Sequence, residues 1–318
     1  MRKEGALNLA VELAPTHKRG LQLRNPVMTA SGTFGYGTEY ARLVDVQRLG
    51  AVVCKGTTLH ARGGNPQPRL VETPSGLLNS IGLQNIGVQA LIRQKAPIWA
   101  GWDVPVVVNI AGETVDEFAQ LAELLTGVPG VAGLEANISC PNVDGGYVAF
   151  GARAETAAEV TRAVARATDL PFLVKLSPNA PDIVEVALAV EQAGAHALSL
   201  INTIVGMAID VKARRPTFAR TTAGLSGPAV KPIALRMVYE VAQVVHVPLV
   251  GIGGIATAGD ALEFLMAGAT AVQVGTASFA NPRATIDVLE GLETFLIREG
   301  LSDIHEVIGV ALPGGGPA

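Results

Sequence analysis

The stretch GLEANISCPN (133–142) gives the first indication of the fold. Residues 133–139 form a short, mainly apolar run, which is typical of a strand buried on both faces of a parallel sheet. The stretch then presents an amide, a hydroxyl and the thiol of Cys140, and a proline closes the turn. A thiol at a strand end can face a pocket and act as a base or nucleophile. A cysteine that only packs in the core would show the same local pattern, so the rest of the chain has to decide.

Seven further runs of this kind occur along the 318 residues. The eight predicted strands cover 26–31, 51–57, 105–111, 133–139, 171–176, 197–203, 248–253 and 271–276. Helical patterns lie between several of them, at 115–125, 154–168, 182–193, 231–245 and 257–267, the last with Thr257 as its N-cap. Eight strand–helix repeats predict an α/β fold, a single closed (β/α)8 TIM barrel over 1–318 with a disordered tail at 313–318. An open, doubly wound sheet is the alternative.

The two longest connections, 59–103 and 204–230, each follow the C-terminal end of a predicted strand. Barrels build their active sites at this face, and long loops there are usually lids or binding loops. We therefore expect extended loops over a functional site at the C-terminal face.

Polar residues and glycines gather at the same strand ends. They are Ser31, Lys55, Asn109, Asn137, Lys175, Asn202, Thr203, Gly253, Gly254, Gly275 and Thr276. The two lysines lie inside apolar runs, where a lysine is costly unless it meets an anion, a cofactor or a structural ion-pair partner. The glycines after the last two strands are typical of a phosphate site in a barrel. The string GIGGIA (251–256) also matches a loose dinucleotide motif, but no acidic residue follows it at the usual distance of about twenty residues.

The composition excludes several other classes of protein. A net charge of −4 gives no reason to expect nucleic acid or an acidic membrane surface as a partner. Cys54 and Cys140 are too few for a disulfide framework or for an iron–sulfur cluster, which needs about four thiolates. Two lone cysteines suit a reducing cytoplasm. Segment 1–15 has neither a long apolar core nor a small-residue cleavage site, so no signal peptide is expected.

With these residues in view, the chain resembles the dihydroorotate dehydrogenase family from residue 7 to about residue 300. The motifs that carry the resemblance are NPVMTASGTFGYG (25–37), KGTT (55–58), NSIGLQN (79–85), NISCPN (137–142), KLSPN (175–179), INT (201–203), GLSGPAVKPIALRMV (224–238), GIGG (251–254) and VGTA (274–277). Family members that use membrane quinones carry serine where this chain has Cys140, so the resemblance is to class 1. The segments GTFGYG and NSIGLQN resemble the NAD-linked class 1B more than the fumarate-linked class 1A.

Residue by residue, the resemblance implies Cys140 as the general base and FMN as the hydride acceptor. Contacts to FMN are implied for Ser31, Lys55, Gly56, Asn109, Asn137, Lys175, Ile201, Gly227, Gly253, Gly254, Gly275 and Thr276. Contacts to dihydroorotate or orotate are implied for Lys55, Asn79, Ser80, Ile81, Gly82, Leu83, Asn137, Asn202 and Thr203. No metal site is implied. The chain departs from the family pattern at Ala136, where a larger aliphatic is commoner, and at Thr222-Ala223, where a second glycine often stands.

The class 1B resemblance also implies a partner. A separate subunit carrying FAD and a [2Fe–2S] centre would relay electrons to NAD, and a homodimer of this chain with two such subunits would form a cytoplasmic heterotetramer. The alternatives are a fumarate-linked class 1A enzyme, a dihydropyrimidine dehydrogenase-like barrel and a non-catalytic flavin- or phosphate-binding barrel that serves as a sensor or scaffold. The glycine-containing loop 141–151 is expected to close over the substrate, and Cys54 is expected only to pack in the core.

Overall fold

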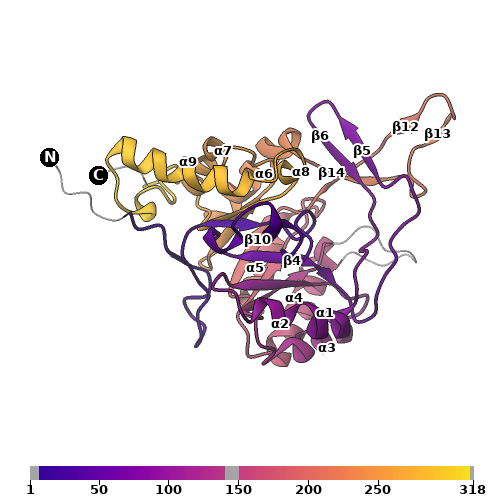
Figure 1. Cartoon of the computed structure of the whole chain (residues 1–318), viewed down its shortest axis with the longest axis horizontal. Coiled ribbons are helices and arrows are strands. Elements are labelled where there is room, and N and C mark those ends of the chain that lie inside the picture. The colour runs from indigo at the N-terminus through magenta and orange to yellow at the C-terminus, as the bar shows by residue number, and fades with distance from the viewer. Residues whose placement is uncertain (1–6, 140–149, 316–318) are drawn as a thin grey trace.

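The computed structural model describes residues 7–139 and 150–315. Cys140, residues 141–149 of the predicted lid and residues 316–318 of the predicted tail lie outside this range. The interior of the described chain is occupied by a sheet of parallel strands, and helices lie around its outside (Figure 1).

Eight parallel strands form this central sheet. They are β3 (Val27–Thr29), β4 (Val52–Thr57), β7 (Val106–Ile110), β8 (Gly133–Asn137), β9 (Phe172–Lys175), β10 (Ala197–Leu200), β15 (Leu249–Ile252) and β16 (Ala271–Val274). Their hydrogen-bonded order is β3-β16-β15-β10-β9-β8-β7-β4. Every residue of β7 is buried, as expected for a strand covered on both faces.

The two edges of this sheet meet and close it into a barrel. Met28 of β3 forms a parallel bridge with Ala51, which precedes β4. The Gly50 N–H also donates to the Val27 carbonyl at 2.8 Å. The predicted (β/α)8 TIM barrel is therefore confirmed, and the open sheet is excluded. The observed strands end up to three residues earlier than predicted, because residues such as Ser31 and Asn202 leave the ladder at the C-terminal face.

The helices that cover the barrel include the five predicted ones, each within three residues of its predicted bounds. They are α1 (Val88–Gln94), α2 (Ala96–Trp99), α3 (Val115–Leu125), α4 (Ala154–Ala167), α5 (Ile183–Gln192), α6 (Lys231–Ala242), α7 (Ala258–Met266), α8 (Ala277–Ala280) and α9 (Ala284–Glu299). Short 3-10 turns occur at η1 (Tyr40–Arg42), η2 (Val46–Arg48), η3 (Phe150–Ala152), η4 (Pro228–Val230) and η5 (Ile304–Glu306). Thr257 caps α7 as predicted, in a reciprocal capping box with Asp260.

A hairpin lies at the N-terminal ends of the barrel strands. It pairs β1 (Val11–Glu12) with β2 (Gln22–Leu23) in antiparallel register. Lys18, between the two strands, forms an ion pair with Asp169 at 3.1 Å, shortly before β9 begins. This end of the barrel is therefore covered by local structure, and the opposite end is left for the long loops.

The two long loops pair with each other in a four-stranded antiparallel sheet, which we call the mouth sheet. Its order is β11-β14-β6-β5, from β5 (Leu70–Thr73), β6 (Gly76–Asn79), β11 (Ile204–Gly206) and β14 (Ala223–Ser226). Leu225 of one loop pairs with Leu78 of the other. Leu78, Phe218 and Ala223 form a small apolar cluster of their own. The expected extended loops are thus one ordered layer at the C-terminal face (Figure 1).

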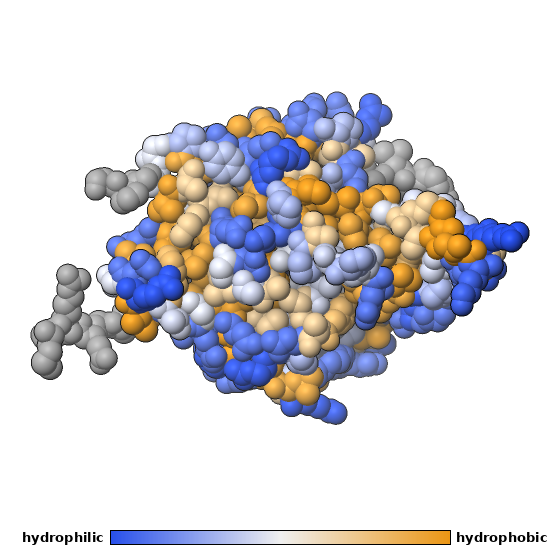
Figure 2. All heavy atoms as spheres, turned by 90° about the horizontal axis from the view of Figure 1, so that it is seen from above, coloured by the Kyte–Doolittle hydropathy of each residue, from blue (hydrophilic) through white to orange (hydrophobic). Residues whose placement is uncertain are grey.

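A second, smaller hairpin projects beyond the mouth sheet, at the right of Figure 1. It pairs β12 (Ile209–Asp210) with β13 (Arg215–Pro216). Ile209 and Val211 are exposed there, next to Lys212 and Arg215. The space-filling view shows hydrophobic and hydrophilic residues side by side at this projecting end (Figure 2). Within 7–139 and 150–315, no helix has both the length and the apolar character needed to cross a membrane.

Candidate active site

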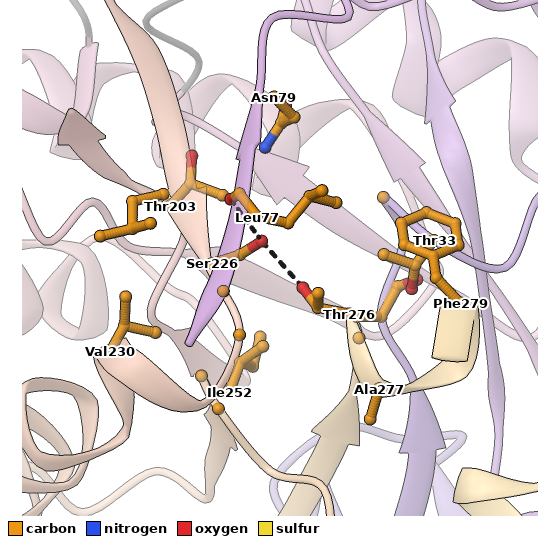
Figure 3. Close-up of a pocket in the computed structure, with 18 of the residues that line it drawn as sticks. Thr33, Leu77, Asn79, Thr203, Ser226, Val230, Ile252, Thr276, Ala277 and Phe279 are labelled. Carbon is orange, nitrogen blue, oxygen red and sulfur yellow. Dashed lines mark hydrogen bonds between the residues drawn. The ribbon is translucent and has the colours of Figure 1, made fainter. Parts of the chain in front are cut away.

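A cavity of about 920 Å³ lies between the C-terminal ends of the barrel strands and the mouth sheet. Strand ends on the barrel side provide Ser31, Lys55, Gly56, Asn109, Asn137 and Lys175. The mouth sheet provides residues on the other side, including Leu77, Asn79 and Ser226, and Figure 3 shows them around the cavity. The lining therefore combines residues from segments that are far apart in the chain.

Nearly all sequence-predicted site residues that the structure describes line this one cavity. The predicted FMN contacts all do so. Of the predicted substrate contacts, Ser80 does not line it: its side chain is buried, and its hydroxyl accepts a hydrogen bond from Asn65 Nδ2 at 3.1 Å. Cys140 lies outside the described residues, so its role stays a prediction.

The loop around Leu83 carries local strain. Leu83 has a φ of 54°, a left-handed conformation that is unfavourable for a residue with a side chain. Its side chain lies against Gly56, where an added Cβ would stand 3.5 Å from Leu83 Cδ2. Strained backbone is common where a ligand is held, which agrees with the assignment of this loop to substrate binding.

A cluster of amides occupies one part of the wall. Asn137 Oδ1 accepts hydrogen bonds from Ser139 Oγ at 3.0 Å and from Asn202 Nδ2 at 3.2 Å. Asn202 Oδ1 in turn accepts from the Thr203 N–H at 2.8 Å. On the mouth-sheet side, Asn79 Nδ2 donates to the Gly224 carbonyl at 3.1 Å. These contacts fix the direction of each amide, so the cavity offers a set pattern of donors and acceptors.

A buried carboxylate lies below the cavity, inside the barrel. Glu135 of β8 is 0% exposed and accepts hydrogen bonds from Asn109 Nδ2 at 2.6 Å, Ser199 Oγ at 2.8 Å and Gln273 Nε2 at 2.7 Å. Its Oε2 atom lies 4.0 Å from Lys175 Nζ. The carboxylate thus joins two cavity residues, Asn109 and Lys175, to the barrel interior.

Asn109 is left with one unused polar atom. Because its Nδ2 faces Glu135, its Oδ1 points the other way, and this buried atom has no hydrogen-bond partner within 7–139 and 150–315. The atom lies against Gly56, where an added Cβ would stand only 2.9 Å from it. A buried acceptor without a partner is costly, so Asn109 Oδ1 is suited to accept from an N–H group of a ligand.

Glycines form a concave surface near the last two strands. Gly227, Gly253, Gly254 and Gly275 line the cavity there. Gly254 has a φ of 75°, and an added Cβ would meet the Gly227 carbonyl at 3.0 Å and the Lys231 backbone nitrogen at 2.9 Å. Thr276 Oγ1 donates to Ser226 Oγ at 2.8 Å across this surface (Figure 3). Close approach of bare backbone is typical of phosphate sites.

Lys231, whose Cβ would stand 2.7 Å from a Cβ added at Gly254, is paired with two acids. Lys231 Nζ contacts Asp260 Oδ1 at 2.8 Å and Glu263 Oε1 at 2.7 Å. The hydrogen bonds from Asp260 and Glu263 raise the pKa of Lys231. Because its charge is already compensated, we expect backbone N–H groups to provide most of the attraction for an anion here.

The second cysteine is not part of the cavity. Cys54 is fully buried in β4, and this burial raises the pKa of its thiol to about 12. A thiol with that pKa is protonated at neutral pH and cannot act as a base. The structure thus gives Cys54 the core position that was expected.

The chain matches a known protein family over most of its length. The family model described as dihydroorotate dehydrogenase matches residues 14–296. The chain belongs to the dihydroorotate dehydrogenase family. The family prediction made from the motifs is therefore confirmed.

Several curated relatives of this dihydroorotate dehydrogenase family member cover almost the whole chain. A protein of Desulforamulus reducens is 56% identical over 305 residues, which are 96% of this chain and 99% of the relative. One of Geotalea uraniireducens is 54% identical over 308 residues, 97% of this chain and 99% of the relative. One of Porphyromonas gingivalis is 53% identical over 291 residues, 92% and 95%. All three are named dihydroorotate dehydrogenase B (NAD(+)), catalytic subunit.

Some cavity residues of this family member were not singled out from the sequence. Strand β5 contributes Glu72, the turn that follows it contributes Pro74 and Ser75, and α8 contributes Phe279. The turn string TPSG (73–76) is a hairpin signal that could have been used. Glu135 was also overlooked, although an acid inside an apolar run is unusual.

Proposed function

We propose that this chain is an FMN-dependent dihydroorotate dehydrogenase that oxidises (S)-dihydroorotate to orotate in pyrimidine biosynthesis. The observation that carries the proposal is the single cavity that contains both the predicted FMN contacts and the predicted substrate contacts. A hydride transfer needs donor and acceptor in one water-poor chamber. The names of the relatives agree with this reaction.

The described residues fit FMN in three respects. The glycine surface around Gly254 suits a phosphate group. The unused Asn109 Oδ1 can accept from an N–H of the flavin ring. Lys175, only 5% exposed, provides a cation where negative charge would gather on the reduced ring.

The amide cluster suits dihydroorotate. This substrate is a small ring with N–H donors and carbonyl acceptors around its edge and one carboxylate. Asn79, Asn137 and Asn202 offer both kinds of partner from fixed positions. Lys55 lies on the same wall and can attract the carboxylate.

The reaction removes a proton from C5 and a hydride from C6 of the substrate. When bound, FMN supplies the hydride acceptor. We assign the removal of the C5 proton to Cys140 as general base, which follows directly after Ser139 in the sequence. Asn137 and Asn202 hold the ring in place, and the mouth sheet covers the cavity and limits access of water. Closure of loop 141–151 over the substrate remains part of this proposal.

We further propose that a separate subunit with FAD and a [2Fe–2S] centre carries the electrons to NAD. The chain's two cysteines are fewer than the four thiolates such a centre needs. The relatives' printed name, catalytic subunit, also agrees with a partner. The expected assembly is a cytoplasmic heterotetramer built on a homodimer of this chain.

The test is an anaerobic titration of the FMN-loaded chain with dihydroorotate. We expect the flavin absorbance to bleach, and Cys140→Ala should slow this bleaching by about 10²–10⁴-fold while still binding orotate. The isolated chain should pass electrons to a dye but not to NAD. Absence of bleaching refutes the proposed reaction. Efficient electron transfer from the reduced flavin to fumarate assigns the chain to class 1A. Faster reduction of the flavin by dihydrouracil than by dihydroorotate assigns it to the dihydropyrimidine dehydrogenase type.

A further inference from the structure

We propose that Glu135 is a positioning residue: its buried carboxylate orients the Asn109 amide and compensates the charge that Lys175 presents to the cofactor. This inference rests on the proposed function, because it takes the cofactor to be FMN. It concerns a residue that the sequence patterns did not reveal and that does not line the cavity itself.

The surroundings of Glu135 argue for a role other than packing. Its carboxylate is fully buried and has partners on four other strands: Asn109 of β7, Lys175 of β9, Ser199 of β10 and Gln273 of β16. The free-energy cost of removing a carboxylate from water is offset only when the buried group is fully hydrogen-bonded. Well-packed apolar residues usually stabilise a core as well or better, so stability alone does not account for this network.

The first consequence concerns the direction of one amide. An ionised carboxylate only accepts hydrogen bonds, so Asn109 must turn its Nδ2 toward Glu135. Asn109 Oδ1 therefore faces the cavity wall at Gly56. Glu135 thus selects an N–H donor over a carbonyl group as the partner of Asn109, and an oxidised flavin ring has such a donor at N3.

The second consequence concerns charge. The distance of 4.0 Å between Glu135 Oε2 and Lys175 Nζ makes the two groups a nearly neutral pair in a buried place. Without Glu135, the ammonium group would be an uncompensated cation beside the flavin. Such a cation favours the reduced ring, which carries more negative charge. Glu135 therefore lowers the reduction potential of bound FMN.

The experiment measures this potential in the FMN-loaded Glu135→Gln variant, which keeps the side-chain shape and removes the charge. We expect the equilibrium with dihydroorotate and orotate to move toward reduced FMN by about tenfold, a rise of about 30 mV for two electrons. Ser199→Ala is the matched control, since it removes one hydrogen bond to the same carboxylate and keeps the charge. It should lower stability without raising the potential. Equal potentials in Glu135→Gln and wild type overturn the inference.

A second measurement does not depend on the variant's folding. In a crystal structure of the FMN-loaded wild type, Asn109 should keep its contact with Glu135 and face a flavin N–H. A flavin carbonyl opposite Asn109, or a Glu135 that has moved away from Lys175, overturns the inference. Wild-type protein that binds no FMN overturns both this inference and the proposed function. If dihydroorotate bleaches the wild-type flavin but the reduction potential of Glu135→Gln equals that of wild type, only the role of Glu135 is overturned and the proposed function stands.

Discussion

Substitution of Gly254 by alanine tests the glycine surface directly. Gly254 has a φ of 75°, and an added Cβ would stand 2.7 Å from Lys231 Cβ, 2.9 Å from the Lys231 nitrogen and 3.0 Å from the Gly227 carbonyl. The left-handed φ costs an alanine about 1–2 kcal/mol, and overpacking against backbone adds about 1–3 kcal/mol. We therefore expect Gly254→Ala to lower the free energy of unfolding by about 2–5 kcal/mol.

A loss of this size leaves most of the protein folded, because the free energy of unfolding of a protein domain is about 5–15 kcal/mol. For a chain of 318 residues the midpoint of thermal unfolding should fall by roughly 3–8 °C. Because relief of the contacts moves the Gly227 carbonyl and the start of α6, FMN should bind at least about tenfold more weakly, a loss of about 1.4 kcal/mol. Thermal unfolding of the FMN-free chain and quenching of FMN fluorescence measure the two effects separately.

Gly259→Ala is the matched control, five residues further along. Gly259 is exposed in α7, has no left-handed φ, and an added Cβ would meet only Thr257 Oγ1 at 3.6 Å. Alanine is favoured over glycine in a helix by about 0.5–1 kcal/mol, so this variant should be unchanged or slightly more stable, with normal FMN affinity. Wild-type stability and affinity in Gly254→Ala would show that the glycine surface is not a phosphate site.

Three further predictions concern groups with shifted pKa values. Burial and the neighbouring His17 lower the pKa of His196 below its ordinary 6.5. Its contribution to stability is therefore complete above about pH 6.5 and is lost as the pH falls from there toward the folded pKa. Urea unfolding at several pH values should show that the free energy of unfolding decreases over this range, and that it decreases less in His196→Leu. Cys54, with a pKa of about 12, should react with a thiol reagent only after unfolding, and the pH profile of flavin reduction in Cys54→Ser should match wild type. Lys231→Met should cost less than about 1 kcal/mol, as partly exposed ion pairs do, and should weaken FMN binding far less than Gly254→Ala; an equal loss would mean that this lysine holds the phosphate.

The barrel could be predicted from local patterns, because each strand is an apolar run with a polar or glycine residue at or near its C-terminal end. β7 and β9 are examples: the ends of both carry a residue, Asn109 or Lys175, that was assigned from the sequence. Almost every residue that the motifs assigned to FMN or substrate, and that the structure describes, lines the cavity. Ser80 is the exception, because its hydroxyl is turned toward Asn65 instead of the cavity.

Contacts between distant segments could not be predicted in this way. Asn79 and Gly224 are 145 residues apart and become neighbours only when the two long loops pair. The partners of Glu135 come from four different strands, so the carboxylate appears as an isolated exception in the sequence until the barrel closes. Periodicity describes single elements, and these contacts depend on how the elements are ordered in space.

The mouth sheet has a consequence for protein engineering. Loops of barrel enzymes are commonly treated as independent modules that can be exchanged one at a time. Here β6 from the first long loop pairs with β14 from the second, so transplanting 59–103 alone would remove one of the two strands that pair with β14, and leave only β11 beside it. The two loops therefore form one transferable unit, to be exchanged together. Insertions belong instead at the turn between β12 and β13, where these two strands pair only with each other within the described chain.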